Sequence, residues 1–435
     1  MSVAPESKLS PLNALRRGAR VSLLTQVTAK LAAFLLALVL ARYMTVEDYG
    51  TYVLVNTWLL ILVVAGLAGV DTSALRFLAQ YSESETERAK IPVFIRWSHV
   101  RVIITGGSVA MVAAVFCLFL GLGESRLDRL IVVAGLITLP LLAISILQQS
   151  ILRAFRKIAH ADLVGLIIRP VTIAALALAA VYFSIDINAT DAIVLLLIGT
   201  SASVVAGAIW MRSLGASHRA RSPTAEESRL WGRTALPMLW ISASHFLLHQ
   251  LDILMLGALA GPGDVAPYAV ASRLADLVAF SLVVASGIVA PLIASLYHAG
   301  RLQELQRLLW VAGRWASLVA LALAVLMVAG PIDFLGLFGE KYSSAFVVLT
   351  ILIGGQLINA VSGPISFLLS MTDNQQGSAR ILGAGVVMNA LLNFLLIPAY
   401  QEIGAAMATA ATTIFWNVSM TVYASSRLRL RATPF

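Results

Sequence analysis

The sequence predicts an all-α integral membrane protein with about twelve transmembrane helices. Of its 435 residues, 59% are hydrophobic and only 12% are charged, which leaves too little polar surface to coat a water-soluble protein of this length. The apolar residues gather in twelve stretches, each long enough to cross about 30 Å of hydrocarbon as a helix. The predicted spans are residues 21–41, 49–70, 98–120, 130–152, 162–183, 191–211, 234–258, 265–294, 310–330, 344–371, 378–398 and 402–424.

Basic residues are concentrated in alternate loops. The loops after odd-numbered spans hold only Arg42, Arg126, Arg129 and Lys341, whereas the other loops and both tails hold nearly all remaining lysines and arginines. Because basic loops stay in the cytoplasm, both ends of the chain are expected to lie inside. The net charge of +9 then faces anionic membrane lipid, so nucleic acid is not expected as a partner.

A polar and basic segment divides the spans into six and six. We interpret residues 212–233 as a cytoplasmic linker between an N-terminal lobe, 21–211, and a C-terminal lobe, 234–424. Cytoplasmic tails are predicted at 1–20 and 425–435. Long loops follow only spans two, six and eight, so no soluble catalytic domain is expected between the spans.

The two lobes resemble each other in sequence. Asp48 and Tyr52, near the start of span two, align at one offset with Asp264 and Tyr268, near the start of span eight. A second match, from Ile151 onward, has almost the same offset. Two matches at a common spacing favour a parallel repeat whose halves enclose a cavity.

Five charged residues stand out inside the predicted spans: Lys30, Arg169, Asp252, Arg273 and Asp276. A charge at mid-bilayer costs roughly 2.5 to 3.5 kcal/mol on insertion scales, so such residues usually face a wet cavity or a partner. The three basic residues are candidates for binding an anionic group such as a pyrophosphate. The alternative is that each one snorkels to the membrane surface or forms a structural ion pair.

Span seven carries three titratable residues on one helical face. His245, His249 and Asp252 follow one another at spacings of four and three. Together with Asp276 they are candidates for ion coupling, because histidine titrates near physiological pH and burial shifts a carboxyl pKa. An ordinary interhelical hydrogen bond is the alternative. No metal site or cofactor is expected, since Cys117 is the only cysteine and no further histidine cluster supplies ligands.

Several amides also lie within the spans. Asn389 and Asn393 are one turn apart in span eleven, and Asn56 lies in span two. Amides bind sugar hydroxyls well, which makes these three candidates for substrate contacts. They also hold membrane helices together, and that role is equally compatible with the sequence.

Three segments together resemble the polysaccharide transporter family, the oligosaccharide flippases of the multidrug/oligosaccharidyl-lipid/polysaccharide exporter superfamily. They are LARYMTVEDYGTYVLV at residues 40–55, FGEKYSSAFVVLTIL from Phe338, and NALLNFLLIPAYQEIGAAMATA from Asn389. The resemblance covers most of the chain. It is specific for the superfamily rather than for the cargo, because these motifs are junctions between helices.

The resemblance implies two six-helix bundles in a V, opening alternately to either side of a bacterial inner membrane. The implied cargo is an undecaprenyl-diphosphate-linked oligosaccharide, such as an O-antigen, exopolysaccharide or capsule repeat unit, moved to the periplasmic leaflet. Lys30 and Arg273 occupy places comparable to cavity-lining basic residues of related flippases. Membrane lipids, a polysaccharide polymerase and export machinery are the implied partners. One departure is Asp373 and Asn374, which stand where a Gly-Arg turn is expected.

Two other functions compete with the flippase. A drug/cation antiporter of the same superfamily would favour acidic cavity walls, whereas the five charged residues singled out here are three basic and two acidic. A membrane-embedded acyltransferase or polysaccharide polymerase would recruit His245 and Asn389. A polymerase usually has a large periplasmic loop, and the sequence shows none, so a transporter rather than an enzyme is predicted.

Overall fold

The computed structural model describes residues 11–119, 126–212, 221–330, 332–372, 374–428 and 430, and all regular structure in them is helical. The helices are α1 (Pro11–Tyr43), α2 (Val46–Leu67), α3 (Val70–Glu83), α4 (Lys90–Phe119), α5 (Arg126–Ala154), α6 (Ile158–Asp162), the π-helix η1 (Leu163–Ile167), α7 (Ile168–Tyr182), α8 (Ala189–Arg212), α9 (Ala225–Leu259), α10 (Pro262–His298), α11 (Leu302–Ala329), the 3₁₀-helix η2 (Glu340–Ala345), α12 (Phe346–Ser362), α13 (Ile365–Met371) and α14 (Gln375–Leu428).

The predicted all-α membrane fold is confirmed. Ten helical stretches of the described residues are long and apolar enough to cross a membrane. One of them, α14, contains the last two predicted spans, which are separated at Gln401, where φ is 50°. The seventh predicted span lies in α9. The tenth, predicted as one helix, is instead divided between α12 and α13, because Gly363 has a φ of 66° and Pro364 has no N–H to continue the helix.

Helical structure extends beyond several of the predicted spans, and α9 begins at Ala225, inside the predicted linker. Residues 11–20 of the predicted N-terminal tail belong to α1, and the loop predicted after span two contains α3. The chain turns between α2 and α3 at Gly69, whose φ is 74°. A Cβ at this position would lie 2.1 Å from the carbonyl oxygen of Ala235, so only glycine permits both the turn and the close approach of α9.

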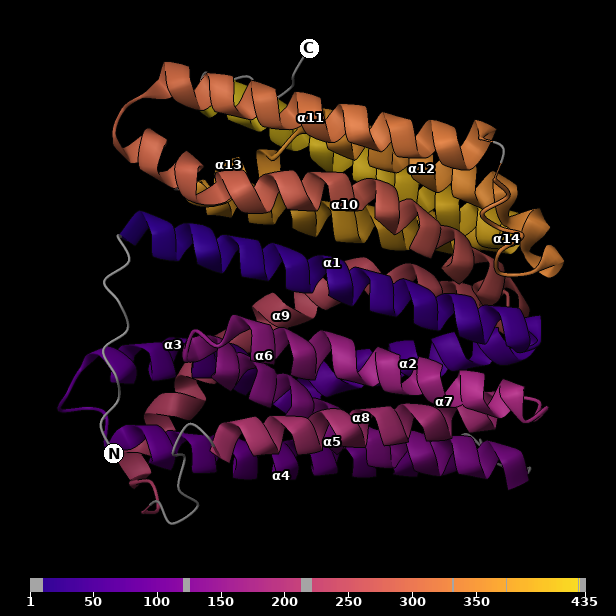
Figure 1. The fold of residues 1–435 in the computed structure, drawn as a ribbon, viewed down its shortest axis with the longest axis horizontal. Coiled ribbons are helices and arrows are strands. Elements are labelled where there is room, and N and C mark those ends of the chain that lie inside the picture. The colour runs from indigo at the N-terminus through magenta and orange to yellow at the C-terminus, as the bar shows by residue number, and fades with distance from the viewer. Residues whose placement is uncertain are drawn as a thin grey trace. The chain divides into compact units, whose positions relative to one another are not determined.

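The described chain forms two compact units. Unit 1 comprises Met1–Leu36, Leu62–Leu176 and Val194–Ser242, and unit 2 comprises Ala37–Ile61, Ala177–Ile193 and Ala243–Phe435. Five helices, α1, α2, α7, α8 and α9, therefore contribute residues to both units. Within unit 2, α10 and α12 pack against each other and each packs against both α11 and α14 (Figure 1). Within unit 1, α5 packs against α3 and α4. The division into two six-helix lobes joined by residues 212–233 stays a prediction.

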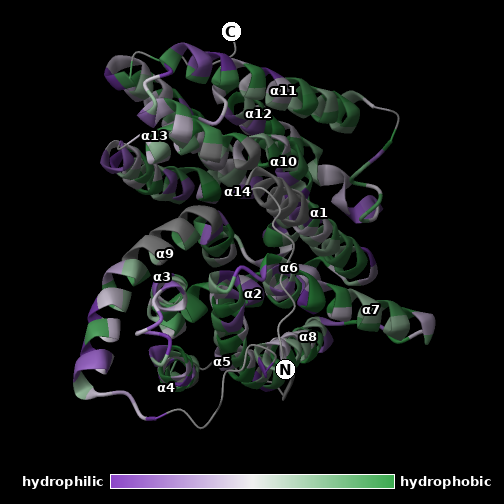
Figure 2. Ribbon diagram, turned by 60° about the vertical axis from the view of Figure 1, so that its left-hand side comes forward, coloured by the Kyte–Doolittle hydropathy of each residue, from purple (hydrophilic) through white to green (hydrophobic). Residues whose placement is uncertain are grey.

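Aromatic residues form part of the core of unit 1. Trp231, at the start of α9, is fully buried and donates its indole N–H to the Tyr81 hydroxyl at 2.9 Å. Its ring lies edge-on to Phe94 and beside Trp97, with centroids 5.0 and 5.2 Å away. Hydrophilic and hydrophobic residues alternate in the first turns of α9, as Figure 2 shows. Trp231 thus anchors the end of the predicted linker to α3 and α4.

Candidate functional site

Asp252 of α9 is the centre of a buried polar cluster in unit 2. Only 7% of the residue is exposed, and each hydrogen bond that the structure describes to its carboxylate comes from a neutral group. Oδ2 accepts from the Tyr268 hydroxyl at 3.0 Å and from the Thr409 hydroxyl at 2.6 Å, and Oδ1 accepts from Asn393 Nδ2 at 2.8 Å. Hydrogen bonds to the charged form stabilise a buried carboxylate even without a basic partner.

The two hydrogen-bond acceptors next to the Asn393 amide determine which of its terminal atoms is the nitrogen. Nδ2 donates both to Asp252 and, at 2.9 Å, to Asn389 Oδ1. A flipped amide would place its oxygen against the Asp252 carboxylate, which is unfavourable. In the orientation observed, the fully buried Oδ1 of Asn393 accepts no hydrogen bond from any described residue. An unsatisfied buried acceptor beside a carboxylate is a site where a proton donor or a cation would be stabilised.

Thr409 gives this cluster two hydrogen-bonding arrangements. Its single hydroxyl proton can go to Asp252 Oδ2 at 2.6 Å or to the Ala405 carbonyl oxygen at 2.9 Å, and the Tyr268 hydroxyl lies 3.0 Å away, where either hydroxyl can donate to the other. Thr409 therefore donates to Asp252 when the carboxylate is ionised. When the carboxyl group is protonated, Thr409 can accept from it and donate to Ala405 instead.

The structure brings together residues that the sequence analysis assigned to different roles. Asp252 was a candidate for ion coupling, whereas Asn389 and Asn393 were candidates for sugar binding. Tyr268 and Thr409, the other members of the cluster, were not predicted as site residues. Tyr268 had one signal, its alignment with Tyr52 in the repeat. Thr409 had none, because one threonine among small residues in a helix is unremarkable.

None of the predicted cationic residues makes a described hydrogen bond to Asp252. Lys30 is exposed and Arg169 is half-buried, both in unit 1. In unit 2, Arg273 pairs with Asp276 at 3.9 Å, with 48% and 39% of the two side chains exposed. An ion pair this long and this exposed contributes little, so the charge of Arg273 is only loosely compensated. Asn56 of α2 is half-buried.

Three predicted features lie outside the described residues in whole or in part. His245 and His249 belong to α9, but their side chains lie outside the described part of the structure, as does Asp373. Among the residues that are described, no three His, Cys, Asp or Glu side chains are close enough to hold a metal ion.

Unit 1 also contains a buried acid, Asp162, which was not predicted as a site residue. Asp162, at the end of α6, accepts from the Thr25 hydroxyl at 2.6 Å and from Arg153 Nη2 at 2.9 Å. Its side chain is 3% exposed, whereas that of Arg153 is 42% exposed. The pair lies directly before the π-helix η1, and it ties α1 to α5 and α6. The basic partner Arg153 indicates a structural ion pair, whereas the described contacts of Asp252 come from neutral groups.

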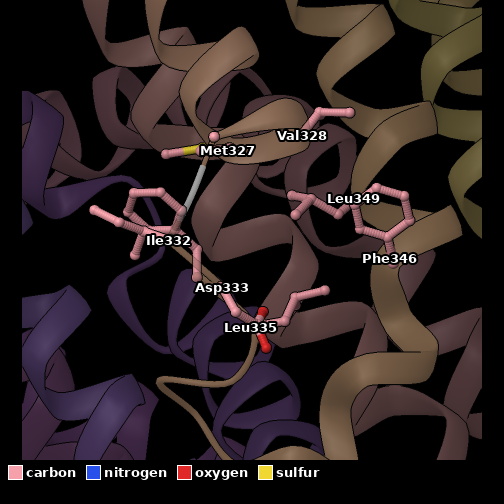
Figure 3. Close-up of a pocket in the computed structure, with 9 residues that line it drawn as sticks. Met327, Val328, Ile332, Asp333, Leu335, Phe346 and Leu349 are labelled. Carbon is pink, nitrogen blue, oxygen red and sulfur yellow. The ribbon is translucent and has the colours of Figure 1, made fainter.

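A small pocket of about 260 Å³ lies at the end of α11 (Figure 3). Apolar residues make most of its lining, including Met327, Leu335, Phe346 and Leu349, and Asp333 is its one acidic residue. Asp333 Oδ1 accepts from the backbone N–H of Gly336 at 2.9 Å, so this carboxylate shapes the loop. None of the predicted site residues lines the pocket.

Two protein families match the sequence. The family described as "Polysaccharide biosynthesis protein" matches residues 15–297, and the MatE family matches residues 237–395. A curated relative, "Probable flippase AglR" of Haloferax volcanii, is 29% identical over 187 residues. That alignment covers 42% of this chain and 37% of the relative.

Solved transporter structures share the fold. A structure described as "Lipid II flippase MurJ, inward closed conformation" has a TM-score of 0.72 at 14% identity, covering 93% of this chain and 87% of that one. The inward-facing structure of a multidrug resistance MATE family transporter of the MOP superfamily has a TM-score of 0.78 at 15% identity, covering 94% and 98%. These likenesses concern the fold, whereas the family match covers well over half of the sequence. The chain is therefore a multi-pass membrane protein of the polysaccharide biosynthesis protein family, with the fold of MOP superfamily transporters.

Proposed function

We propose that this protein flips an undecaprenyl-diphosphate-linked oligosaccharide from the cytoplasmic to the periplasmic leaflet of a bacterial inner membrane. The family match over residues 15–297 is the observation that carries the proposal. The relatives named as flippases support it. The relatives reported above are all named as flippases or transporters, which favours transport over membrane-embedded enzyme chemistry.

The proposed cargo carries a diphosphate, which requires positive charge along its path. We assign this role to Lys30, Arg169 and Arg273, because guanidinium and ammonium groups bind phosphate oxygens through charge-assisted hydrogen bonds. Arg273 is held at 3.9 Å by Asp276, so a phosphate has only a weak internal competitor to displace. In this scheme Asp276 compensates the charge of Arg273 while no cargo is bound.

The amides divide between two roles. Asn56 is half-buried in α2, and we propose that it contacts sugar hydroxyls. Asn393 Nδ2 already donates to both Asp252 and Asn389. We therefore propose that Asn389 and Asn393 support Asp252 and do not bind the sugar. His245 and His249 lie on the same helix as Asp252 and are proposed to serve the same coupling function.

Asp252 is the proposed coupling group of the cycle. Its cluster offers carboxylate, amide and hydroxyl oxygens, including the unsatisfied Oδ1 of Asn393. This donor set suits a proton and equally a hard monovalent cation such as Na⁺. Asp252, Asn389, Asn393 and Thr409 would hold that ion, and its charge would offset the buried carboxylate. The two arrangements of the Thr409 hydroxyl allow the cluster to gain or lose a proton without leaving a donor unpaired.

The wider setting follows from the same proposal. Both termini lie in the cytoplasm, the lobes 21–211 and 234–424 rock about the linker, and a polysaccharide polymerase and export machinery act on the delivered cargo. The basic cytoplasmic loops predicted from sequence support this orientation.

Reconstituted protein tests the function directly. Purified protein in proteoliposomes is expected to move a fluorescent or radiolabelled lipid-linked oligosaccharide between leaflets, and protein-free liposomes provide the background. The MatE match at residues 237–395 favours a second candidate, a drug/cation antiporter. Robust dye efflux without movement of the lipid-linked sugar would establish that alternative and reject the flippase.

A further inference from the structure

Two basic residues of unit 2, far apart in the sequence, connect two loops. Each donates hydrogen bonds to backbone carbonyl oxygens in the segment that contains the other. Arg42, in the last turn of α1, donates from Nη1 to the Leu337 carbonyl oxygen at 2.7 Å. Lys341, in η2, donates in the opposite direction to the Met44 carbonyl oxygen and more weakly, at 3.5 Å, to that of Arg42. We name these four residues, Arg42, Met44, Leu337 and Lys341, the outer strap.

The outer strap explains two exceptions in the charge pattern. Arg42 and Lys341 are two of the four basic residues in loops predicted to face away from the cytoplasm. Met44 directly follows α1, where helix carbonyls are left without N–H partners and carry the negative end of the helix dipole. An ammonium group at this position is favourable because it satisfies such a carbonyl. Both exceptional charges are therefore used in contacts that tie loops together.

Close backbone packing surrounds the outer strap. The Tyr49 and Tyr342 rings meet edge to face with centroids 6.4 Å apart. Gly50 of α2 lies against the first residue of α10, so that a Cβ added to it would be 1.9 Å from the Pro262 carbonyl oxygen. The end of α1 and the start of α2, which belong to the first half of the sequence, thus pack against segments of the second half.

We propose that the outer strap is a latch that closes the non-cytoplasmic end of the transport path and must open in every cycle to release cargo on that side. This inference rests on the proposed function, since only a protein that alternates access has to break these contacts. The latch is made mainly of side chain to carbonyl hydrogen bonds, which can break and re-form without burying an unpaired charge, because both basic groups are at the solvent end of the helices. A permanent structural tie is the competing explanation.

Cross-linking separates a latch from a permanent tie. In a Cys117→Ser background, which lacks all cysteines, Tyr43→Cys and Leu337→Cys place thiols beside the strap while Arg42 and Lys341 are kept. A short, reducible bis-methanethiosulfonate reagent should stop flipping in proteoliposomes, and reduction should restore it. The matched control, Leu337→Cys with Ile332→Cys, puts both thiols on the α11–α12 loop and should flip normally when linked. Undiminished flipping by the linked Tyr43–Leu337 pair would overturn the latch.

A second measurement does not depend on the cargo. Leu54→Cys, on α2 where it packs against Gly257, reports access from the non-cytoplasmic side through its reaction with a membrane-impermeant maleimide. Loss of both strap side chains, Arg42→Ala with Lys341→Ala, should raise the labelling rate about tenfold, given the typical strength of charge-assisted hydrogen bonds. Arg129→Ala, which removes another basic residue of the same predicted side, should not change the rate. Equal labelling with and without the strap rejects the latch, whereas absence of flipping by the wild type rejects only the proposed function.

Discussion

Asn393 donates to Asp252 across 2.8 Å, although 141 residues separate them in the sequence. The contact joins α14 to α9 within unit 2 and leaves the Asn393 Oδ1 without a partner among the described residues. In the described part of the chain, the donors to the buried Asp252 carboxylate are the neutral groups of Tyr268, Asn393 and Thr409. This relationship underlies the proposed coupling site.

Replacing Asp252 by asparagine should uncouple transport from its driving ion. The amide has nearly the same shape but neither binds a proton at neutral pH nor offers a negative charge to a cation. Flipping by Asp252→Asn should lose its response to imposed pH and Na⁺ gradients in proteoliposomes, and the gradient that drives the wild type identifies the ion. Glu304→Gln, which removes an acid exposed on α11 and paired with Arg301, should respond as the wild type does. A normal gradient response in Asp252→Asn would exclude Asp252 as the coupling group.

Removing either proposed phosphate contact should stop export. Lys30→Ala and Arg273→Ala each delete a positive charge from the path of a diphosphate, and each should abolish polysaccharide export in cells without lowering protein abundance. Surface polysaccharide and immunoblots of the membrane fraction measure the two quantities. Arg301→Ala removes a charge of an exposed pair and should leave export intact. Wild-type export from both Lys30→Ala and Arg273→Ala would refute the cationic path.

The start of α9 should loosen in acid. Arg221 binds Glu227 through two hydrogen bonds of 2.8 and 2.5 Å and lowers the pKa of that carboxyl from 4.5 to about 2. Because the folded-state pKa is depressed, this contribution is complete above pH 4.5 and is lost as the pH falls toward about 2.

Hydrogen exchange at the beginning of α9 measures this effect. The wild type should exchange more slowly than Glu227→Gln at neutral pH, and the difference should vanish near pH 2. A difference between the two proteins that stays constant across this range would contradict the assignment. The pair is partly solvent-exposed, so only the local helix end is expected to respond.

Truncating Trp231 should destabilise unit 1 strongly. Its indole is fully buried and hydrogen-bonded to Tyr81, and a large buried aromatic replaced by alanine typically costs about 3–5 kcal/mol. Trp231→Ala should therefore lower the Tm of the detergent-solubilised protein markedly, and Trp231→Phe should lower it less, because only the hydrogen bond and part of the packing are lost. Trp315→Ala, at a side chain that is 66% exposed, serves as the matched control. Equal Tm values for the two alanine variants would show that Trp231 is not an anchor.

The sequence predicted most of the membrane-spanning helices from the length of its apolar stretches. Twelve apolar stretches predicted the helices, because crossing a membrane requires about twenty apolar residues whatever their neighbours are. The division of the tenth span at Gly363 and Pro364 was missed, since a proline inside a membrane helix kinks some helices and ends others. Helix α3 was missed because its 14 residues are amphipathic and do not form a long apolar run.

The sequence alone determined that this chain is helical, lies in a membrane and belongs with polysaccharide transporters, because composition and local motifs carry that information. Only the tertiary structure decided which polar residues meet. Asp252 joins Tyr268, Asn393 and Thr409, and Arg42 reaches a carbonyl 295 residues away. Helical periodicity places a residue on a face of its own helix, but which helix packs against that face depends on side-chain packing between segments far apart in the chain.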